Sequence, residues 1–292
     1  MPELPEVETV RRGLDRLLPD LTIADVHSSA DAPKSFPNAK EDVRAFLLGA
    51  KVTQVRRRAK VLLIDLSTDY TLVTHLKMTG QLVFRSKNDR FGAGHPNDSL
   101  VGVLPDRSTR VTILFTSGAK LFFNDQRKFG WMKLLPTIEV PNIDFMKKVG
   151  PEPLEADFTW QLLRDRLMRR KNTTIKAALL DQSVIAGVGN IYADESLWGA
   201  KIHPATLVKN VHDDQFKMLH KALIDVLTLS IANGGSTDRN YVSAEGKKGS
   251  YLSFARVFRR EGEACPRHPD SHVIKLRVAG RGTHICPKCQ RL

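Results

Sequence analysis

The second and third residues, Pro2 and Glu3, carry groups that could attack and open a sugar. Removal of Met1 would leave the secondary amine of Pro2 at the N-terminus. An α-amino group has a pKa of about 8, so part of it is neutral and nucleophilic near pH 7. When a secondary amine condenses with a sugar aldehyde carbon, it forms a cationic iminium that promotes elimination. Glu3 is then placed to exchange protons with the ring oxygen or the leaving group.

A helix must hold such an amine in place, and the residues that follow predict one. Apolar residues recur at helical spacing, at Val7, Val10, Leu14 and Leu17. A packed helix fixes its own N-terminus, as a catalytic amine requires. Pro2 and Glu3 also suit an ordinary helix start, where acidic groups favour the positive end of the dipole. These residues alone therefore leave both interpretations open.

The three cysteines lie near the C-terminus in a spacing typical of a metal site. The pattern is Cys265-x2-His268-x17-Cys286-x2-Cys289. Two short ligand pairs separated by a hairpin-length insert suit one closed tetrahedral zinc site, and Cys3His is an established structural donor set. His272 is the rival fourth ligand, but its longer gap from Cys265 fits a compact turn less well. An odd number of cysteines in one tail does not favour a disulfide framework.

The overall charge indicates a polyanionic partner. The chain has 45 Lys and Arg against 32 Asp and Glu, a net charge of +13 and a pI of about 9.8. Because no run of 18 or more apolar residues occurs and the N-terminus lacks a signal pattern, we expect a soluble intracellular protein and no membrane partner. A length of 292 residues with 41% hydrophobic residues predicts two domains.

The first half of the chain is rich in predicted strands. β-Branched and aromatic residues between turn signals predict strands at 51–55, 61–66, 71–76, 111–115 and 120–123. These strands predict a β-sandwich. Residues 86–105 hold Gly, Asn, Asp and Pro with few large apolar residues, so we expect a mobile surface loop there.

Beyond a proline-containing linker the pattern becomes helical. We expect helices at 158–170, 175–181, 191–198 and 212–232. The string Gly187-Val188-Gly189-Asn190 precedes the third helix, and glycines before a helix let backbone amides approach a phosphate. Between the zinc-ligand pairs, residues 273–278 and 283–285 predict a hairpin with Arg281 at its tip.

Taken together, these motifs resemble the formamidopyrimidine-DNA glycosylase family over nearly the whole chain. The string MPELPEVETVRRGL at residues 1–14 resembles the N-terminus of that family, and GVGN at 187–190 resembles its helix-two-turn-helix signature. The resemblance implies an α+β fold with an N-terminal β-sandwich flanked by helices, a helical helix-two-turn-helix domain and a β-hairpin zinc finger. We expect the boundaries 1–136, linker 137–153, 154–238, a lesion-capping connection at 239–256, and 257–292.

The resemblance also implies the chemistry. It makes Pro2 the nucleophile at the anomeric carbon, Glu3 the acid that assists sugar opening, and Lys60 an active-site lysine that handles protons and contacts phosphate. Without the resemblance, Lys60 would belong to a solvated charge run. Arg281 becomes a residue that reaches the flipped-out nucleotide and assists the second, δ, elimination, whereas a phosphate contact is its plainer interpretation.

The expected DNA contacts follow from the same resemblance. Three residues are expected to fill the stack that a rotated base leaves, with Arg127 pairing with the orphaned partner base: Met78, Arg127 and Phe129. Asn190 and Lys176 are expected to hold DNA backbone. Ser108 and Asn172 stand where relatives often carry His and Lys for DNA contact, and Lys171 could replace the second. His268 departs from the usual four-cysteine pattern.

We therefore expect a bifunctional DNA glycosylase and AP lyase that acts as a monomer on damaged double-stranded DNA and binds one structural Zn²⁺. The expected lesions are 8-oxoguanine and formamidopyrimidines, and the expected location is a bacterial cytoplasm, in association with the nucleoid. One alternative is an endonuclease VIII-like glycosylase for oxidised pyrimidines. Another is a zinc-finger protein that binds DNA without catalysis, and intact Pro2, Glu3 and Lys60 argue against it.

Overall fold

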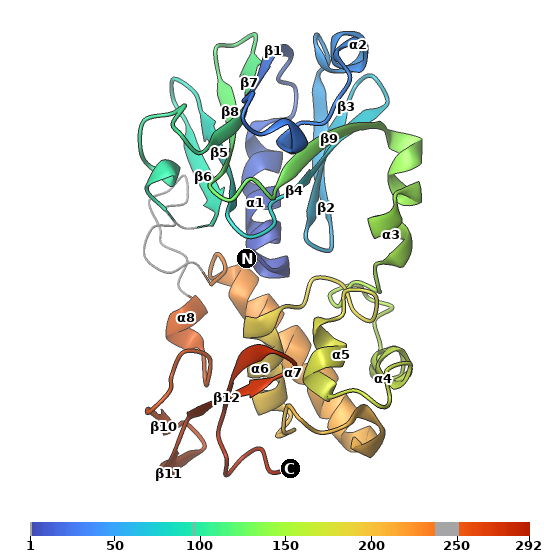
Figure 1. Ribbon diagram of the computed structural model, residues 1–292, viewed down its shortest axis with the longest axis vertical. Coiled ribbons are helices and arrows are strands. Elements are labelled where there is room, and N and C mark those ends of the chain that lie inside the picture. The colour runs from blue at the N-terminus through green and yellow to red at the C-terminus, as the bar shows by residue number, and fades with distance from the viewer. Residues whose placement is uncertain (1, 96, 237–250) are drawn as a thin grey trace. The chain divides into compact units, whose positions relative to one another are not determined.

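The computed structural model contains two compact units, and each is built around its own core (Figure 1). The described residues are 2–95, 97–236 and 251–292. Residues 2–147 and 233–236 form the first unit, whereas Lys148–Ala232 and Tyr251–Leu292 form the second. The first unit consists mainly of strands and the second mainly of helices, as the α+β prediction requires.

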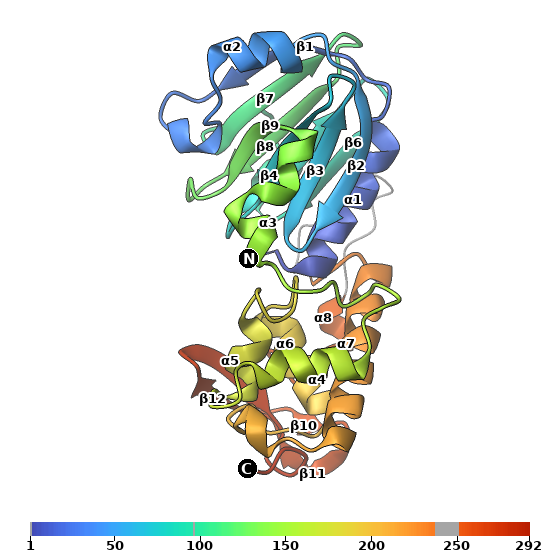
Figure 2. The same ribbon diagram turned by 90° about the vertical axis from the view of Figure 1, so that its right-hand side faces the viewer.

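Two antiparallel sheets form the first unit (Figure 2). The five-stranded sheet has the order β1 (Ile23–Ser28), β7 (Thr109–Phe115), β8 (Lys120–Asp125), β5 (Gly80–Arg85) and β6 (Arg90–Gly94). The four-stranded sheet has the order β2 (Val52–Arg58), β3 (Val61–Leu66), β4 (Tyr70–His75) and β9 (Trp131–Pro136). Side chains from both sheets share one core, which includes Leu62, Leu72, Leu82 and Phe123. The predicted β-sandwich is confirmed.

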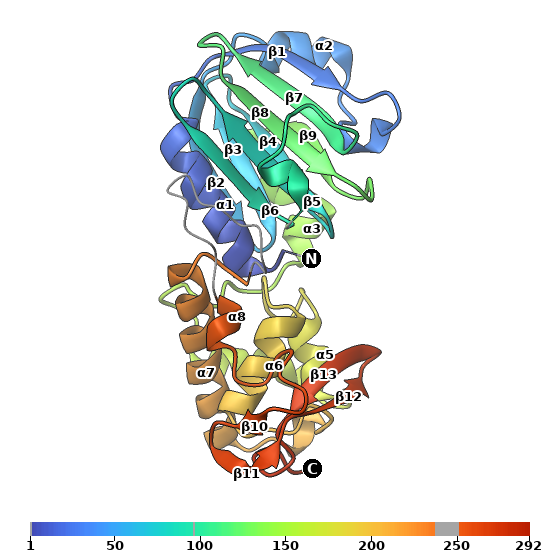
Figure 3. The same cartoon turned by 90° about the vertical axis from the view of Figure 1, so that its left-hand side faces the viewer.

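Helix α1 (Leu4–Leu17) closes one edge of this sandwich (Figure 3). It packs against β2 and β6, which are edge strands of the two different sheets. The approach is close, because a Cβ on Gly13 would lie 2.1 Å from the ring of Phe91 in β6. Val7, Val10 and Leu14 are fully buried, as their helical spacing predicts. The helix therefore fixes the start of the chain against both sheets.

The prediction of a surface loop at 86–105 is wrong in part. Strand β6 lies within it, and so does a 3-10 turn (Asp98–Leu100). Phe91 and Leu100 are both 3% exposed, and they anchor a segment whose glycines gave no strand pattern. Pairing with β5 and burial of two side chains therefore outweigh low strand propensity.

Short helical segments lie between β1 and β2 and after β9. These are 3-10 turns at Pro33–Ser35 and Thr137–Asn142, helix α2 (Lys40–Asp42), a π-helical turn at Val43–Leu47, and α3 (Asp144–Lys148). The last 3-10 turn and α3 occupy part of the expected linker at 137–153.

The second unit contains the four predicted helices, each with ends within two residues of the prediction. They are α4 (Trp160–Met168), α5 (Ile175–Leu180), α6 (Asn190–Gly199) and α7 (Asp213–Ala232), followed by a short α8 (Tyr251–Phe254) and preceded at α7 by a 3-10 turn (Val208–Asn210). Helix α4 begins later than predicted because the Thr159 hydroxyl accepts the Leu162 N–H and so caps the helix.

Two hairpins complete the second unit. The first pairs β10 (Ala264–Cys265) with β11 (His268–His272), and the second pairs β12 (Ile274–Val278) with β13 (Arg281–Ile285). In the second, Ala279 and Gly280 have φ values of 51° and 72°, as a two-residue turn matched to strand twist requires. Most of the expected lesion-capping connection at 239–256 lies outside the described residues.

In the parts of the chain that the structure describes, no helix combines the length and the apolar character needed to cross a bilayer.

Candidate functional site

The amino end of α1 is held by a reciprocal capping arrangement. Pro2 is buried, and Glu3 is 4% exposed at the N-cap position. The Glu3 N–H donates to Glu6 Oε2 at 2.8 Å, and the Glu3 carboxylate in turn accepts the Glu6 N–H. The second oxygen of Glu6 accepts the Ser236 N–H at 2.7 Å. Sequence reasoning missed Glu6, although its three-residue spacing from Glu3 is the signal of a capping box.

Lys60 lies in the tight turn between β2 and β3 and is 5% exposed. The preceding Ala59 has a left-handed φ of 52°. Arg57 donates through Nη1 to the Ala59 carbonyl at 2.9 Å and through Nε to Glu8 Oε2 at 3.1 Å. One guanidinium therefore joins the Lys60 turn to the helix that follows Pro2.

The charge on Glu8 sustains this connection. Burial opposes ionisation of its carboxyl, but hydrogen bonds from Arg11 and Arg12, together with the charge of Arg57, outweigh burial and lower the pKa of Glu8. The side chains of Glu8 and Arg57 are only 12% and 10% exposed, so solvent screens their ion pair weakly.

His75 is a buried neighbour that sequence reasoning missed. It ends β4, is 7% exposed, and its ring lies 6.0 Å from Trp131 and 5.9 Å from Phe145. Burial, with the positive charges of Lys77 and Lys60, lowers its pKa to about 3. The imidazole is therefore neutral, and its Nδ1 accepts the Lys77 N–H at 3.0 Å. A neutral ring does not add a second cation beside Lys60.

Met78, Arg127 and Phe129 gather at the surface of the first unit, as expected. Met78 follows β4, and the other two lie in the loop between β8 and β9. The Arg127 Nη1 lies 3.0 Å from Met78 Sδ, and its guanidinium carbon lies 4.8 Å from the centre of the Phe129 ring. Met78 and Phe129 remain 40% and 53% exposed. The group thus presents two apolar side chains around one cation.

Ser108 is buried in this structure. It is 3% exposed, its hydroxyl donates to Asp106 Oδ1 at 2.7 Å, and the Ser99 hydroxyl lies 3.1 Å away. Its hydroxyl therefore bonds within the protein, and the DNA contact that the resemblance implies for Ser108 stays a prediction. The exposed residue beside it is Arg107.

Lys176 is neither a solvated lysine nor a free phosphate ligand. It is 0% exposed, and its Nζ donates to Asp194 Oδ1 at 2.6 Å, to Thr283 Oγ1 at 2.7 Å and to the Gly282 carbonyl at 3.2 Å. Three acceptors compensate the buried ammonium. In this structure the side chain therefore anchors β13 to the helices, and the phosphate contact expected of Lys176 stays a prediction.

Asn190 contributes to the same anchor. It is the first residue of α6, and its Nδ2 donates to the Gly282 carbonyl at 3.0 Å. Asp194, one turn further along α6, accepts the His284 N–H at 3.0 Å. The exposed Arg281 therefore begins a strand in which both Gly282 and His284 are hydrogen-bonded to α6. Sequence reasoning missed Asp194.

Glu195, the next residue of α6, holds the segment that leads to the first hairpin. It is 1% exposed, and its carboxylate accepts the N–H groups of Arg256, Val257 and Phe258 at 2.8, 2.9 and 2.8 Å. Burial raises the pKa of Glu195, whereas these three hydrogen bonds oppose the rise. The only sequence signal was an acidic pair inside an apolar helix.

Lys171 and Asn172 lie in the exposed turn between α4 and α5. Both side chains are accessible, so neither is excluded from the DNA contact expected of it.

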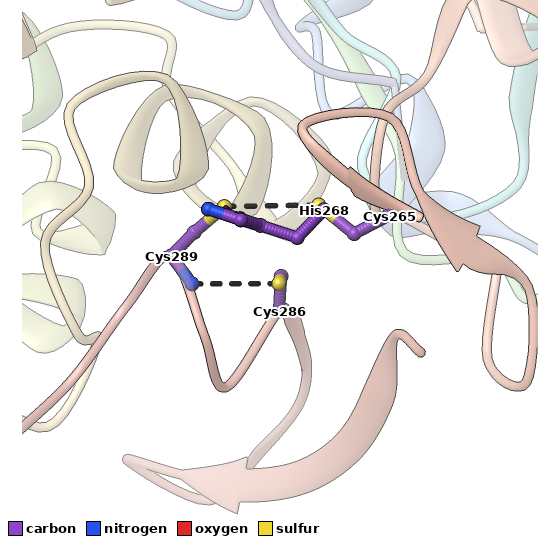
Figure 4. Close-up of side chains that lie close together, drawn as sticks. All are labelled: Cys265, His268, Cys286 and Cys289. Carbon is purple, nitrogen blue, oxygen red and sulfur yellow. Dashed lines mark hydrogen bonds between the residues drawn. The ribbon is translucent and has the colours of Figure 1, made fainter. Parts of the chain in front are cut away.

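The four expected zinc ligands converge (Figure 4). The donor atoms of Cys265, His268, Cys286 and Cys289 all lie within 4.8 Å of one another. Cys265 Sγ and Cys289 Sγ are 3.7 Å apart, close to the edge of about 3.8 Å that a tetrahedron with Zn–S bonds of about 2.3 Å requires. His268 Nδ1 lies 3.1 Å from Cys289 Sγ. His272 is exposed and outside this cluster, so the geometry favours His268.

The protonation of the thiols also fits a cation at this position. Burial, reinforced by Cys265 and Cys286, raises the pKa of Cys289 to about 12. For Cys286, burial is outweighed by hydrogen bonds from Ser271 and from backbone, and its pKa falls to about 7. Clustered buried thiolates repel one another, and Zn²⁺ relieves that repulsion by direct coordination. The four residues therefore suit one structural Zn²⁺.

Comparison with known protein families agrees with this architecture. The model of the formamidopyrimidine-DNA glycosylase N-terminal domain matches residues 1–132, and that of the formamidopyrimidine-DNA glycosylase H2TH domain matches 149–241. A zinc finger found in FPG and IleRS matches 270–292.

Individual relatives match over their whole length. The formamidopyrimidine-DNA glycosylase of Pelotomaculum thermopropionicum is 40% identical and covers 100% of both chains, and that of Chloroflexus aurantiacus is 41% identical over 99% of this chain and 98% of its own. A crystal structure of Lactococcus lactis Fpg with abasic-site DNA aligns with a TM-score of 0.86, 33% identity, and 99% and 100% coverage of this chain and that one. A Lactococcus lactis variant with Fapy-dG DNA gives 0.86, 34% and full coverage of both chains.

The sandwich, the H2TH helices and the zinc hairpins together define a DNA glycosylase of the H2TH class. Within that class, the chain belongs to the formamidopyrimidine-DNA glycosylase family. Glycosylase activity on damaged DNA and the accompanying AP lyase activity are the activities of this family. The relatives named above are formamidopyrimidine-DNA glycosylases, whereas the alternative considered from the sequence was an endonuclease VIII-like enzyme.

We predict that His268→Ala loses zinc and unfolds the hairpins, because so small a finger buries too little surface to fold without metal. Metal analysis should find about one zinc per chain in the parent protein and in the control His272→Ala, and much less in His268→Ala. Tight DNA binding should fall with the zinc content. Full occupancy in His268→Ala together with loss in His272→Ala would transfer the ligand role to His272.

We also predict that His75 makes the protein less stable in acid. Its folded pKa of about 3 lies below its ordinary value, so the unfolded state binds the proton first. Stability is fully present above about pH 6.5 and falls as the pH decreases towards 3, by up to about 1.4 kcal/mol per pH unit. Denaturant unfolding at several pH values should give a flatter profile for His75→Gln than for the parent.

Proposed function

We propose that the chain excises oxidised purines, 8-oxoguanine and formamidopyrimidines, from duplex DNA and then cleaves the strand by β- and δ-elimination. The observation that supports this most is the arrangement of Pro2, Glu3 and Lys60 on rigid elements of one unit. The Lactococcus lactis proteins with similar structures were crystallised with Fapy-dG DNA and with abasic-site DNA.

The proposed reaction begins after removal of Met1. The Pro2 nitrogen bonds to the anomeric carbon of the damaged nucleotide and loses its proton. The bond from that carbon to the base breaks, and the base leaves with the electron pair and takes up that proton. Glu3 protonates the ring oxygen as the sugar opens, which leaves a cationic iminium. Loss of a proton from the neighbouring carbon then expels the 3′ phosphate, and the second elimination expels the 5′ phosphate. A one-nucleotide gap remains.

Lys60 serves these eliminations in our proposal. Its burial beside the neutral His75 lowers the hydration of its ammonium, and the Arg57 link fixes the turn that carries it. A lysine held in this way can exchange protons during β-elimination and contact a phosphate. We assign Arg281, at the start of β13, to the δ-elimination.

Met78, Arg127 and Phe129 form the proposed wedge. Unstacking and unpairing a nucleotide costs a few kcal/mol, so side chains must occupy the vacated space. Met78 and Phe129 would fill the stack, while Arg127 pairs with the partner base. Their exposure and mutual contacts support this role.

The second unit contributes backbone contacts in this proposal. We assign Asn190, Lys171 and Asn172 to DNA phosphates, and Lys176 to support of β13. We further propose that the protein acts as a monomer with one structural Zn²⁺. Because its proposed substrate is chromosomal DNA, we propose that the protein acts at the chromosome, in the cytoplasm of a bacterial cell.

We predict that borohydride traps a covalent complex between the protein and an 8-oxoguanine duplex, because it reduces the iminium at Pro2. Pro2→Gly should weaken trapping while DNA binding persists, and Arg16→Ala, an exposed position on the same helix, should trap like the parent. The assay is denaturing gel electrophoresis of the labelled duplex. If no oxidised or abasic duplex gives a trapped species, the alternative of a zinc-finger protein that binds DNA without catalysis remains.

We predict that Phe129→Ala slows excision from intact duplex much more than cleavage at a preformed abasic site, which has no base to extrude. Lys60→Ala should slow both reactions, because a lysine at the reaction centre serves both substrates. The DNA binding of Lys60→Ala should also depend less on salt concentration than that of the parent, because the proposed contact of Lys60 with phosphate is lost. Single-turnover rates on the two substrates measure the difference. An equal loss on both in Phe129→Ala would remove the wedge assignment.

A further inference from the structure

The three wedge residues come from two separate loops, and one buried carboxylate lies between these loops. Asp125 ends β8 and is 0% exposed. Its Oδ1 accepts the Thr79 hydroxyl and, at 3.2 Å, the Arg127 N–H. Its Oδ2 accepts the N–H groups of Phe129 at 2.8 Å and Gly130 at 2.6 Å. A single side chain thus accepts four hydrogen bonds from both loops.

The hydrogen bonds to Asp125 come from the backbone N–H groups of Arg127 and Phe129 and, in place of Met78 itself, from its neighbour Thr79. Thr79 directly follows Met78, and its hydroxyl oxygen also accepts the Arg127 N–H at 3.1 Å. The loop between β8 and β9 turns through Lys128, whose φ of 58° is left-handed. Without the carboxylate, the N–H groups on the inner side of this turn would lose their buried acceptor.

The end of the loop, at Gly130, is also tightly packed. A Cβ on Gly130 would lie 2.7 Å from the Phe123 ring, 3.0 Å from the His75 carbonyl and 3.1 Å from Asp125 Oδ2. The loop therefore returns to β9 with no room to shift, and the wedge side chains project from a fixed base.

We infer that Asp125 is a positioning residue that makes the two loops one rigid wedge before DNA binds, an inference that rests on the proposed function of Met78, Arg127 and Phe129. A wedge that is ordered in advance does not lose conformational entropy during base extrusion. Hydrogen bonds to a charged acceptor are stronger than those to a neutral one, so the carboxylate suits this task better than an amide. Asp125 acts through the loops and does not touch the reacting atoms.

The test compares Asp125→Asn with a matched buried carboxylate. Asp65 in β3 is 6% exposed and accepts hydrogen bonds from Gln54, Arg56 and Thr71 within the same unit, away from the wedge loops. We expect Asp125→Asn to slow single-turnover excision of 8-oxoguanine from intact duplex by about tenfold or more, because an amide cannot accept on both sides. Cleavage at a preformed abasic site should change by less than about threefold. Asp65→Asn should lower thermal stability without separating the two rates.

Thr79→Val provides a second variant that leaves the carboxylate in place. It removes one of the four hydrogen bonds, so it should separate the two rates in the same direction and to a smaller extent. If Asp125→Asn does not fold, Thr79→Val alone decides the matter.

Two different failures can be told apart. If Phe129→Ala separates the two rates but the folded Asp125→Asn and Thr79→Val slow both equally, or neither, Asp125 only supports the fold and this inference is overturned while the proposed function stands. If Phe129→Ala itself does not separate them, the wedge assignment fails, and the inference fails with it.

Discussion

A chain terminus is normally the most mobile part of a domain, and the chemistry proposed for Pro2 requires a rigid one. Helix α1 provides this rigidity. It packs against edge strands of both sheets, and the reciprocal hydrogen bonds of Glu3 and Glu6 cap its amino end. The ion pair of Glu8 with Arg57 then links that helix to the turn of Lys60. The amine, the acid and the lysine are therefore held by one packed helix and by the turn that Arg57 links to it, and loss of that packing would disperse all three.

Buried carboxylates repeat this organising role elsewhere in the chain. Asp194 and Glu195 are consecutive on α6 and almost fully buried, yet they hold different segments, one β13 and the other the approach to the first hairpin. Asp125 does the same for the wedge loops. Each of these groups would be costly to bury alone, and each is compensated by several donors. At Asp125, Asp194 and Glu195, a buried carboxylate thus attaches a loop or strand to the rest of its unit.

The sequence predicted most of the architecture, because its signals were local. Helical periodicity, strand alternation and the cysteine spacing identified the sandwich, the helices and the metal ligands. Strands β1, β5, β6 and β9 were not predicted. The glycines of β6 carry no strand pattern, and its stability comes from pairing and from Phe91. The burial of Lys176 and Ser108 was not predicted, for another reason. A motif gives the type of a residue but not its burial, and only the packing around Asp194 and Asp106 shows that both side chains face inwards.

His268 stands where the family resemblance implies a fourth cysteine, and this difference concerns more than the donor atom. A zinc centre with four thiolates has a net charge of −2, whereas three thiolates and a neutral imidazole give −1. The finger is therefore one unit less anionic, which favours its approach to a polyanion. It also has one thiolate fewer that oxidants can convert to sulfenic acid or a disulfide. If oxidised bases are the substrate, as proposed above, the oxidants that create them would find one fewer thiolate to attack in the finger.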